Sequence, residues 1–293
     1  MHVLWEPFEF AFLRHGLVVC TFAGALCGLL GVYVTLRGMS YIGHGLSHAI
    51  FGGAAICAAA SVNYFVGAGL WGLGTGLSVS RVTRRRIIGS DAAIGVMTTA
   101  SFAFGIALKD RIPGVKKSID ATIFGNALGV TTGDMWLIIA ITVLTAAIVL
   151  ARYRVLLFTT FDPDVADVSG VRTSWVDARL MVLLSGSILA SMKVLGVTLI
   201  AAALVIPPVI ARMLTNSFLT MLWVSTALGA ICGFAGMYLS YYLEISSGPM
   251  IVLTNFVVFM VVYACTGSRG LRRSAGLDHH DARVSAATAT VSA

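Results

Sequence analysis

The sequence is short of charged residues. Asp, Glu, Lys and Arg make up 11% of its 293 residues, whereas a soluble domain carries about 25%. Hydrophobic residues make up 58% of the chain, and the mean hydropathy is +0.91. A chain with so little charge cannot cover a globular surface with polar groups, so the composition excludes an ordinary soluble protein and indicates a membrane protein.

Cysteine is scarce and has neither metal-site nor disulfide spacing. The five cysteines all lie in apolar segments, and no CxxC or Cys/His pattern occurs. A free cysteine packs like a small hydrophobic residue. The sequence therefore excludes a disulfide framework and a zinc knuckle.

Catalytic signatures are also missing. The sequence contains no nucleophile elbow, HExxH motif, P-loop or Rossmann fingerprint, so we expect no enzyme activity, no catalytic residue and no permanently bound cofactor. The net charge is +7, but the basic stretches lack the interleaved aromatic residues of a nucleic-acid surface. We therefore expect membrane lipid as a partner and no nucleic acid.

Long apolar segments dominate the chain. About 20 such residues cross a membrane as a helix, so the sequence predicts an all-α polytopic membrane protein with about nine transmembrane helices (eight to ten) within residues 1–267. The predicted segments are 11–36, 44–61, 64–80, 91–108, 134–151, 178–192, 195–213, 218–243 and 249–267.

The polar tail at 268–293 is rich in Ala, Ser and Thr and is expected to be disordered in the cytoplasm. Its Asp278-His279-His280-Asp281 run fits either a metal site or a flexible solvated tail, and the sequence leaves both open.

The basic residues predict the orientation in the cell membrane. If the arginine-rich stretch 81–86 is cytoplasmic and the spans alternate, most Lys and Arg residues lie on the same side. Cytoplasmic loops carry such an excess. The expected multi-pass protein has its N-terminus outside the cell and its C-terminus in the cytoplasm.

Two histidines carry the clearest chemical signal. His44 and His48 are four residues apart, so on a helix they lie on one face, one turn apart. Two imidazoles at this spacing can bind one metal ion, and ionisable groups within a membrane are functional candidates because they are costly there. A pair of neutral histidines that hydrogen-bond across the bundle is the alternative.

Two further residues are candidates for supporting or gating this site. Ser47 lies between the histidines, and Asp91 opens the fourth apolar segment. A role of Ser90 or Asp91 as a helix N-cap explains that position equally well.

A short helix is predicted between the apolar segments. Asp162 is a suitable N-cap, Pro163 suits the first helical position, Asp164 suits the first turn and Gly170 suits the C-terminal end. A self-contained cytoplasmic helix at about 161–171 is typical of a partner-docking element.

Several motifs spaced along nearly the whole chain resemble the permease subunits of ABC-type manganese, zinc and iron uptake systems (the ABC-3 family). The matching motifs are Leu-Arg-x-Met-Ser at 36–40, Leu-Ser-His-Ala at 46–49, Asp-x-x-Ile-Gly at 91–95, Phe-Gly-Asn-x-Leu at 124–128, Phe-Asp-Pro-x-x-Ala at 161–166 and Val-Ile-Pro-Pro-x-x-Ala-Arg at 205–212.

The resemblance implies an ATP-driven importer of divalent metal ions, zinc or manganese and possibly iron. Two copies would form the pore beneath an extracellular metal-binding protein, and a cytoplasmic ABC ATPase would dock on the helix that includes Phe161, Ala166 and Gly170. The family's pore histidine corresponds to His48, whereas its aspartate position holds His44 here. Imidazole suits zinc better than manganese, so zinc is slightly favoured.

A gradient-driven secondary transporter without an ATPase is the alternative. Such proteins use inverted repeats with broken helices, and proton coupling requires buried carboxylates. The predicted spans hold no Asp or Glu near their middle, which argues against this alternative.

Overall fold

The computed structural model describes residues 10–59, 64–84, 89–111, 127–196 and 199–266. All regular structure in these ranges is helical. The long helices are α2 (Ala11–Leu36), α3 (Ile42–Ala59), α4 (Tyr64–Arg84), α5 (Ser90–Arg111), α7 (Thr132–Ala151), α10 (Thr173–Leu195), α11 (Ile200–Leu214), α12 (Phe218–Leu243) and Ser247–Thr266. The short ones are η3 (Ala127–Gly129), α8 (Tyr153–Phe161) and α9 (Pro163–Val168).

Each apolar segment predicted from the sequence coincides with one long helix, and the all-α membrane fold is confirmed. Within the described ranges, five helices are long and apolar enough to cross a membrane: α2, α7, α10, α12 and Ser247–Thr266. The apolar stretches Asp91–Phe104 and Ile200–Leu214 are shorter. The total of about nine spans therefore stays a prediction. The tail at 268–293, with its Asp-His-His-Asp run, lies outside the described residues.

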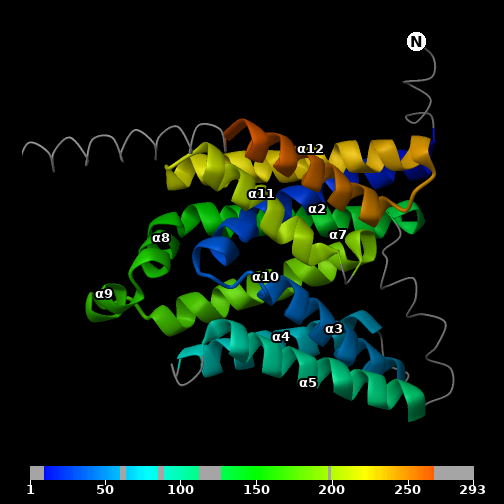
Figure 1. Ribbon diagram of the computed structural model, residues 1–293. Helices are drawn as coiled ribbons and strands as arrows, with labels where there is room; N and C mark the ends of the chain where they lie inside the picture. The colour runs from blue at the N-terminus through cyan, green and yellow to red at the C-terminus, as the bar shows by residue number, and fades with distance from the viewer. Residues whose placement is uncertain (1–9, 60–63, 85–88, 112–126, 197–198, 267–293) are drawn as a thin grey trace, which may run out of the picture.

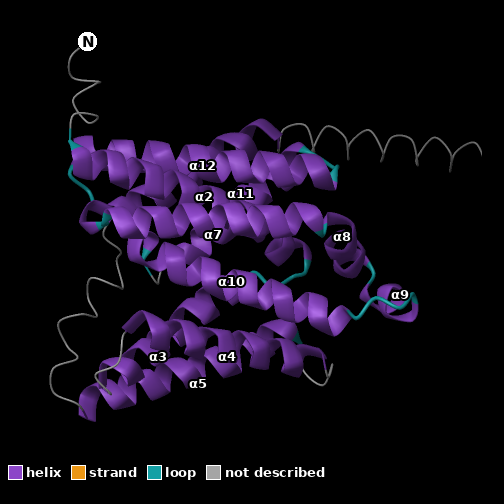
Figure 2. Ribbon diagram, turned by 180° about the vertical axis from the view of Figure 1, so that it is seen from behind, coloured by secondary structure: helices purple, strands orange, loops and turns teal. Residues whose placement is uncertain are grey.

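The helices form two groups (Figures 1 and 2). Helices α3, α4 and α5 pack on one another, and α2 packs against α12, α11 and α7 in the second group. Helix α10 lies between the groups and contacts α4 as well as α2. The α2–α3 turn thus passes the chain from one group to the other.

Helix α2 is buried along most of its length because small residues let its neighbours approach closely. A Cβ atom added at Gly24 would lie 2.1 Å from the carbonyl oxygen of Gly229 in α12. One turn later, a Cβ at Gly28 would lie 2.3 Å from the carbonyl oxygen of Ser225. Since the hydrophobic effect does not drive helices together within lipid, this close backbone packing is what holds α2 against α12.

The ends of several helices meet at one end of the bundle, which we call the basic end. Asp177, near the start of α10, pairs with Arg37 and Arg84 at the ends of α2 and α4. Arg152, which follows α7, borders the start of α10, and Arg212 of α11 lies near the start of α12. This arrangement matches the predicted alternation of the spans, while the cytoplasmic position of the basic end stays a prediction.

Candidate metal site

A tight turn connects α2 to the helix that carries the two histidines. Gly38 has φ +65°, a left-handed conformation that glycine adopts without steric cost. The amide of Met39 donates to the Val34 carbonyl oxygen at 3.0 Å, which ends α2 in the manner of a Schellman motif. Helix α3 starts at Ile42, so the histidines lie in its first two turns.

His44 and His48 face each other on α3. Their Nε2 atoms are 3.1 Å apart, and the rings meet edge to face with centroids at 4.3 Å. The rings of His48 and Phe102 of α5 also meet edge to face, at a centroid distance of 4.6 Å. His44 is exposed and His48 is half-buried on the single chain, so the pair is not sealed in the apolar core.

The spacing of the two Nε2 atoms suits a shared metal ion. Zinc binds histidine nitrogen at about 2.0 to 2.1 Å, and nitrogens 3.1 Å apart can both reach that distance from one ion. In the metal-free pair, one Nε2 donates its proton to the other. Binding of an ion requires both Nε2 atoms to be deprotonated, so the metal replaces the hydrogen bond between the rings.

The second nitrogen of His48 lacks the support that strong metal sites provide. Its Nδ1 atom is buried and has no hydrogen-bond partner among the described residues. A ligand histidine almost always donates its other N–H to an acceptor, which orients the ring and makes it a stronger ligand. His48 is therefore suited to brief rather than permanent binding.

Among the contacts of the described residues, neither predicted supporting residue bonds to the imidazoles. The Ser47 hydroxyl is buried and donates to the Gly43 carbonyl oxygen at 2.6 Å, within its own helix. Asp91 is exposed in the first turn of α5. At 1.5 Å per residue, Asp91 lies roughly 16 Å along the axis from Phe102, which contacts His48. It lies about one turn before Ile94, which packs on Gly45 beside His44.

The N-cap alternative for Ser90 or Asp91 does not match the helix boundary. Helix α5 starts at Ser90 itself. The amide of Ala93 donates to the Gly89 carbonyl oxygen at 3.0 Å, so Gly89 occupies the position before the first helical residue.

The site is incomplete within the described part of one chain. Among the described residues, no group of three or more His, Cys, Asp or Glu side chains can hold a metal ion. Zinc takes four ligands and manganese takes more. Water or a second copy of the chain can provide the remaining ligands.

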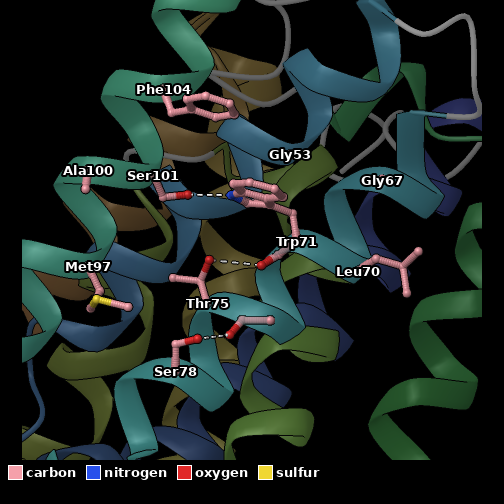
Figure 3. A pocket seen from close by; sticks show the side chains of 11 residues that line it. Gly53, Gly67, Leu70, Trp71, Thr75, Ser78, Met97, Ala100, Ser101 and Phe104 are labelled. Atoms are coloured by element: carbon pink, nitrogen blue, oxygen red, sulfur yellow. Dashed lines mark hydrogen bonds between the residues drawn. The ribbon is translucent and has the colours of Figure 1, made fainter. Parts of the chain in front are cut away.

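A cavity of ≈ 650 Å³ lies beside this region but does not include the histidines (Figure 3). It opens between α4 and α5, with Gly53 of α3 at its wall. The indole N–H of Trp71 donates to the Ser101 hydroxyl at 2.6 Å, and Trp71 stacks on Phe104. This bond joins α4 to α5 next to Phe102, and no His, Cys, Asp or Glu is among the residues that line the cavity.

The predicted short helix is present as α9 at the basic end and extends away from the bundle (Figures 1 and 2). The Asp162 carboxylate accepts a hydrogen bond from the Val165 amide at 3.0 Å, with Pro163 at the first helical position. Asp164 lies in the first turn. Gly170, with φ +86°, ends the segment as predicted from its position.

Helix α9 has one anchored face and one exposed apolar face. Ala166 is fully buried, whereas Val168 is 91% exposed, Val165 is 51% exposed and the neighbouring Phe161 is 64% exposed. An apolar patch on a polar end of a protein marks an interaction surface. Val165 and Val168 are not among the residues predicted from the sequence, although their spacing of three residues on a short helix is a usable signal.

A chain of polar contacts connects α9 to the rest of the basic end. The Thr173 hydroxyl donates to the Asp167 carboxylate at 3.0 Å and accepts a hydrogen bond from Arg84. Arg84 and Arg37 both pair with Asp177, at 3.7 Å and 2.6 Å. These contacts link α9 and α10 to the last residue of α4 and to the turn that precedes α3.

Arg37 also ties α8 to this group. Its guanidinium donates to the hydroxyls of Thr159 and Thr160, both at 3.1 Å. Nothing in the sequence pairs residues so far apart in the chain, so only the fold reveals the network around Asp177.

Residues 9–266 match the ABC 3 transport family. The chain belongs to this family. The match covers the described helices from α2 to Ser247–Thr266, and it confirms the resemblance seen in the spaced motifs.

Known proteins of the same kind are similar along most of their length. The manganese transport system membrane protein MntC of Halalkalibacterium halodurans is 32% identical over 90% of this chain and 90% of its own length. The manganese import system permease protein ScaB of Streptococcus parasanguinis is 35% identical over 87% of this chain and 91% of its own. The solved structure of PsaBC from Streptococcus pneumoniae in complex with Fab matches with a TM-score of 0.79, 30% identity and coverage of 89% and 95%.

Proposed function

We propose that this chain is the permease subunit of an ATP-driven importer of divalent metal ions, and that His44 and His48 bind the ion in transit. The observation that carries the proposal is the pair of Nε2 atoms 3.1 Å apart on one helix. The names of the relatives MntC and ScaB, which refer to manganese transport, point to the same class of substrate.

Two copies of the chain enclose the pore in this proposal. His44 is exposed on the single chain, and an imidazole facing lipid would be unfavourable. A second copy related by a two-fold axis removes this exposure and brings the number of imidazoles at one ion to four. The expected stoichiometry is one ion for two chains.

The metal itself is zinc or manganese, with iron as a further option. The relatives are named for manganese, whereas imidazole favours zinc over manganese. Transport requires that the ion also leave the site. Because the Nδ1 atom of His48 has no hydrogen-bond partner among the described residues, His48 binds the ion more weakly, which favours its release.

ATP hydrolysis is assigned to a separate cytoplasmic ATPase that docks on α9. The exposed side chains of Phe161, Val165 and Val168 provide the contact surface. An extracellular metal-binding protein delivers the ion at the opposite end of the bundle, where Lys193 and Asp134 join α10 to α7 at 2.5 Å. The basic end then lies in the cytoplasm, as the positive-inside rule predicts.

The test is uptake of radioactive zinc and manganese by the assembled transporter in cells that lack their own uptake systems. We expect His48→Ala to reduce uptake at least about tenfold, since even outer-shell changes at metal sites cost 10- to 100-fold. The matched control is His15→Ala, on α2 outside the pair, which should leave uptake unchanged.

Full uptake by the His48→Ala transporter would contradict the proposed site. Uptake that survives ATP depletion but stops when the proton gradient is collapsed would instead favour the gradient-driven alternative.

A further inference from the structure

Two adjoining hollows at the basic end form one continuous groove between α4, α7 and α10. The first, of ≈ 440 Å³, contains Arg152, Arg172 and Arg179. The second, of ≈ 550 Å³, shares Arg152, Trp175 and Arg179 with it and extends along Leu77 and other apolar side chains. We call the whole the arginine groove.

The mouth of the arginine groove carries uncompensated positive charge. Its three arginines are exposed, and none forms an ion pair within the part of the chain that the structure describes. Asp177, a nearby carboxylate on α10, already pairs with Arg37 and Arg84. Helix α10 also begins here, so the positive end of its dipole adds to the field.

The other part of the groove is apolar and lies along membrane helices. Ile148, Val182 and Leu183 line it together with Leu77, and both α7 and α10 are candidate membrane spans. Trp175, 60% exposed, lies between the charged and the apolar parts. Tryptophan is enriched at this level, where the membrane meets water.

We propose that the arginine groove binds one anionic phospholipid. The phosphate would lie among the three guanidinium groups, which suit phosphate oxygens, and one acyl chain would lie along the apolar part. An acidic protein surface would match the charge but would leave the apolar extension unfilled. An anionic lipid matches both parts, and basic pockets between membrane helices are known to hold such headgroups.

The test is native mass spectrometry of the delipidated, assembled transporter in a neutral detergent. Phosphatidylglycerol and phosphatidylcholine with identical acyl chains are added in equal amounts. Each arginine contributes about fivefold to the affinity for an anionic lipid. The triple variant R152Q/R172Q/R179Q should therefore lose on the order of a hundredfold in phosphatidylglycerol affinity, and its phosphatidylcholine binding should not change.

The matched control removes the same charge outside the groove. R81Q/R154Q/R212Q alters three arginines that do not line the groove and should retain the preference for phosphatidylglycerol. Both triple variants are compared with the parent protein by their melting temperature in neutral detergent.

A second variant tests the apolar part. Ala178→Trp fills the groove next to Val182 and should weaken binding of both lipids. Unchanged phosphatidylglycerol binding by R152Q/R172Q/R179Q would overturn the proposal. So would displacement of the lipid by soluble glycerol phosphate at equal concentration, which would identify a simple phosphate site. Phosphatidylglycerol binding that appears only after the ATPase is removed from the transporter would assign the groove to a protein contact instead.

Discussion

The proposed metal site consists of two imidazole groups, whereas the resemblance to the family implies one aspartate and one histidine at these two positions. His44 and His48 are positioned by the turn at Gly38 and by the contact of His48 with Phe102. Since both potential ligands are nitrogen donors, the choice of residue at position 44 is expected to set metal preference. Carboxylate oxygen suits manganese and imidazole suits zinc.

The substitution His44→Asp tests this expectation. It replaces one nitrogen ligand by oxygen while His48 stays in place, so the ratio of manganese to zinc uptake should rise several-fold. Uptake of both radioactive metals is measured in the same cells. His44→Gln, which removes the imidazole without adding a carboxylate, is the control and should lower both rates. An unchanged ratio in His44→Asp would remove the argument for zinc.

At the scale of single elements, the packing of α2 against α12 depends on glycines, which have no side chain, along one face of α2. A Cβ at Gly24 would lie 2.1 Å from a backbone oxygen of α12, and backbone cannot move aside as a flexible side chain can. Overpacking of this kind costs about 1 to 3 kcal/mol.

Gly24→Ala should therefore lower the melting temperature of the permease in detergent. The matched control is Gly186→Ala in α10, where the new Cβ would meet nothing within 4 Å. That change should stabilise the helix by up to about 1 kcal/mol, because alanine has the higher helix propensity. Equal effects of the two substitutions would contradict the close-packing argument.

Helix α9 gives a second prediction at this scale. Val168 is 91% exposed, so Val168→Asp should leave the stability of the permease unchanged while placing a charge in the proposed contact surface. We expect at least tenfold weaker binding of the ATPase, measured by co-purification and titration, which corresponds to about 1.4 kcal/mol. Ser174→Asp, an exposed position on α10, is the control. Normal ATPase binding by Val168→Asp would exclude this face as the docking surface.

At the scale of the whole molecule, the two helix groups meet at the basic end through Asp177. This carboxylate joins α10 to Arg37 before α3 and to Arg84 at the end of α4. Through Thr173 and Asp167, the same network reaches α9. A movement of α9 would therefore act on the group of helices that carries the histidines.

Asp177→Ala should uncouple ATP hydrolysis from transport. The variant leaves two arginines without their carboxylate, which costs on the order of 1 to 3 kcal/mol for hydrogen bonds to charged groups. Assembly with the ATPase and basal hydrolysis should persist, while metal-dependent stimulation and uptake should fall at least several-fold. The ratio of stimulated to basal ATPase activity in reconstituted vesicles measures this effect.

The ion pair at the opposite end gives the matched control. Asp134→Ala removes the contact with Lys193 and the carboxylate's capping bonds with Thr131, and it should cost comparable stability without changing that ratio. If Asp177→Ala reduces stability but leaves stimulation intact, the network is structural and does not transmit the movement of α9.

The sequence by itself determined the class of protein, the positions of the long helices and the local form of α9. These follow from properties that act over short stretches of chain: hydropathy over about 20 residues, and the cap, proline and glycine at Asp162, Pro163 and Gly170. The family could also be recognised, because its motifs recur in order along the chain. The pairing of His44 with His48 was predictable for the same reason, since both lie on one helix.

Only the tertiary structure decided which distant residues meet. The ion pair between Arg37 and Asp177 and the burial of Ser47 depend on how α2, α3 and α10 pack against their neighbours. The arginine groove likewise combines residues from three helices. Such contacts depend on the rotation and crossing of whole helices, which packing between neighbours fixes and local sequence does not.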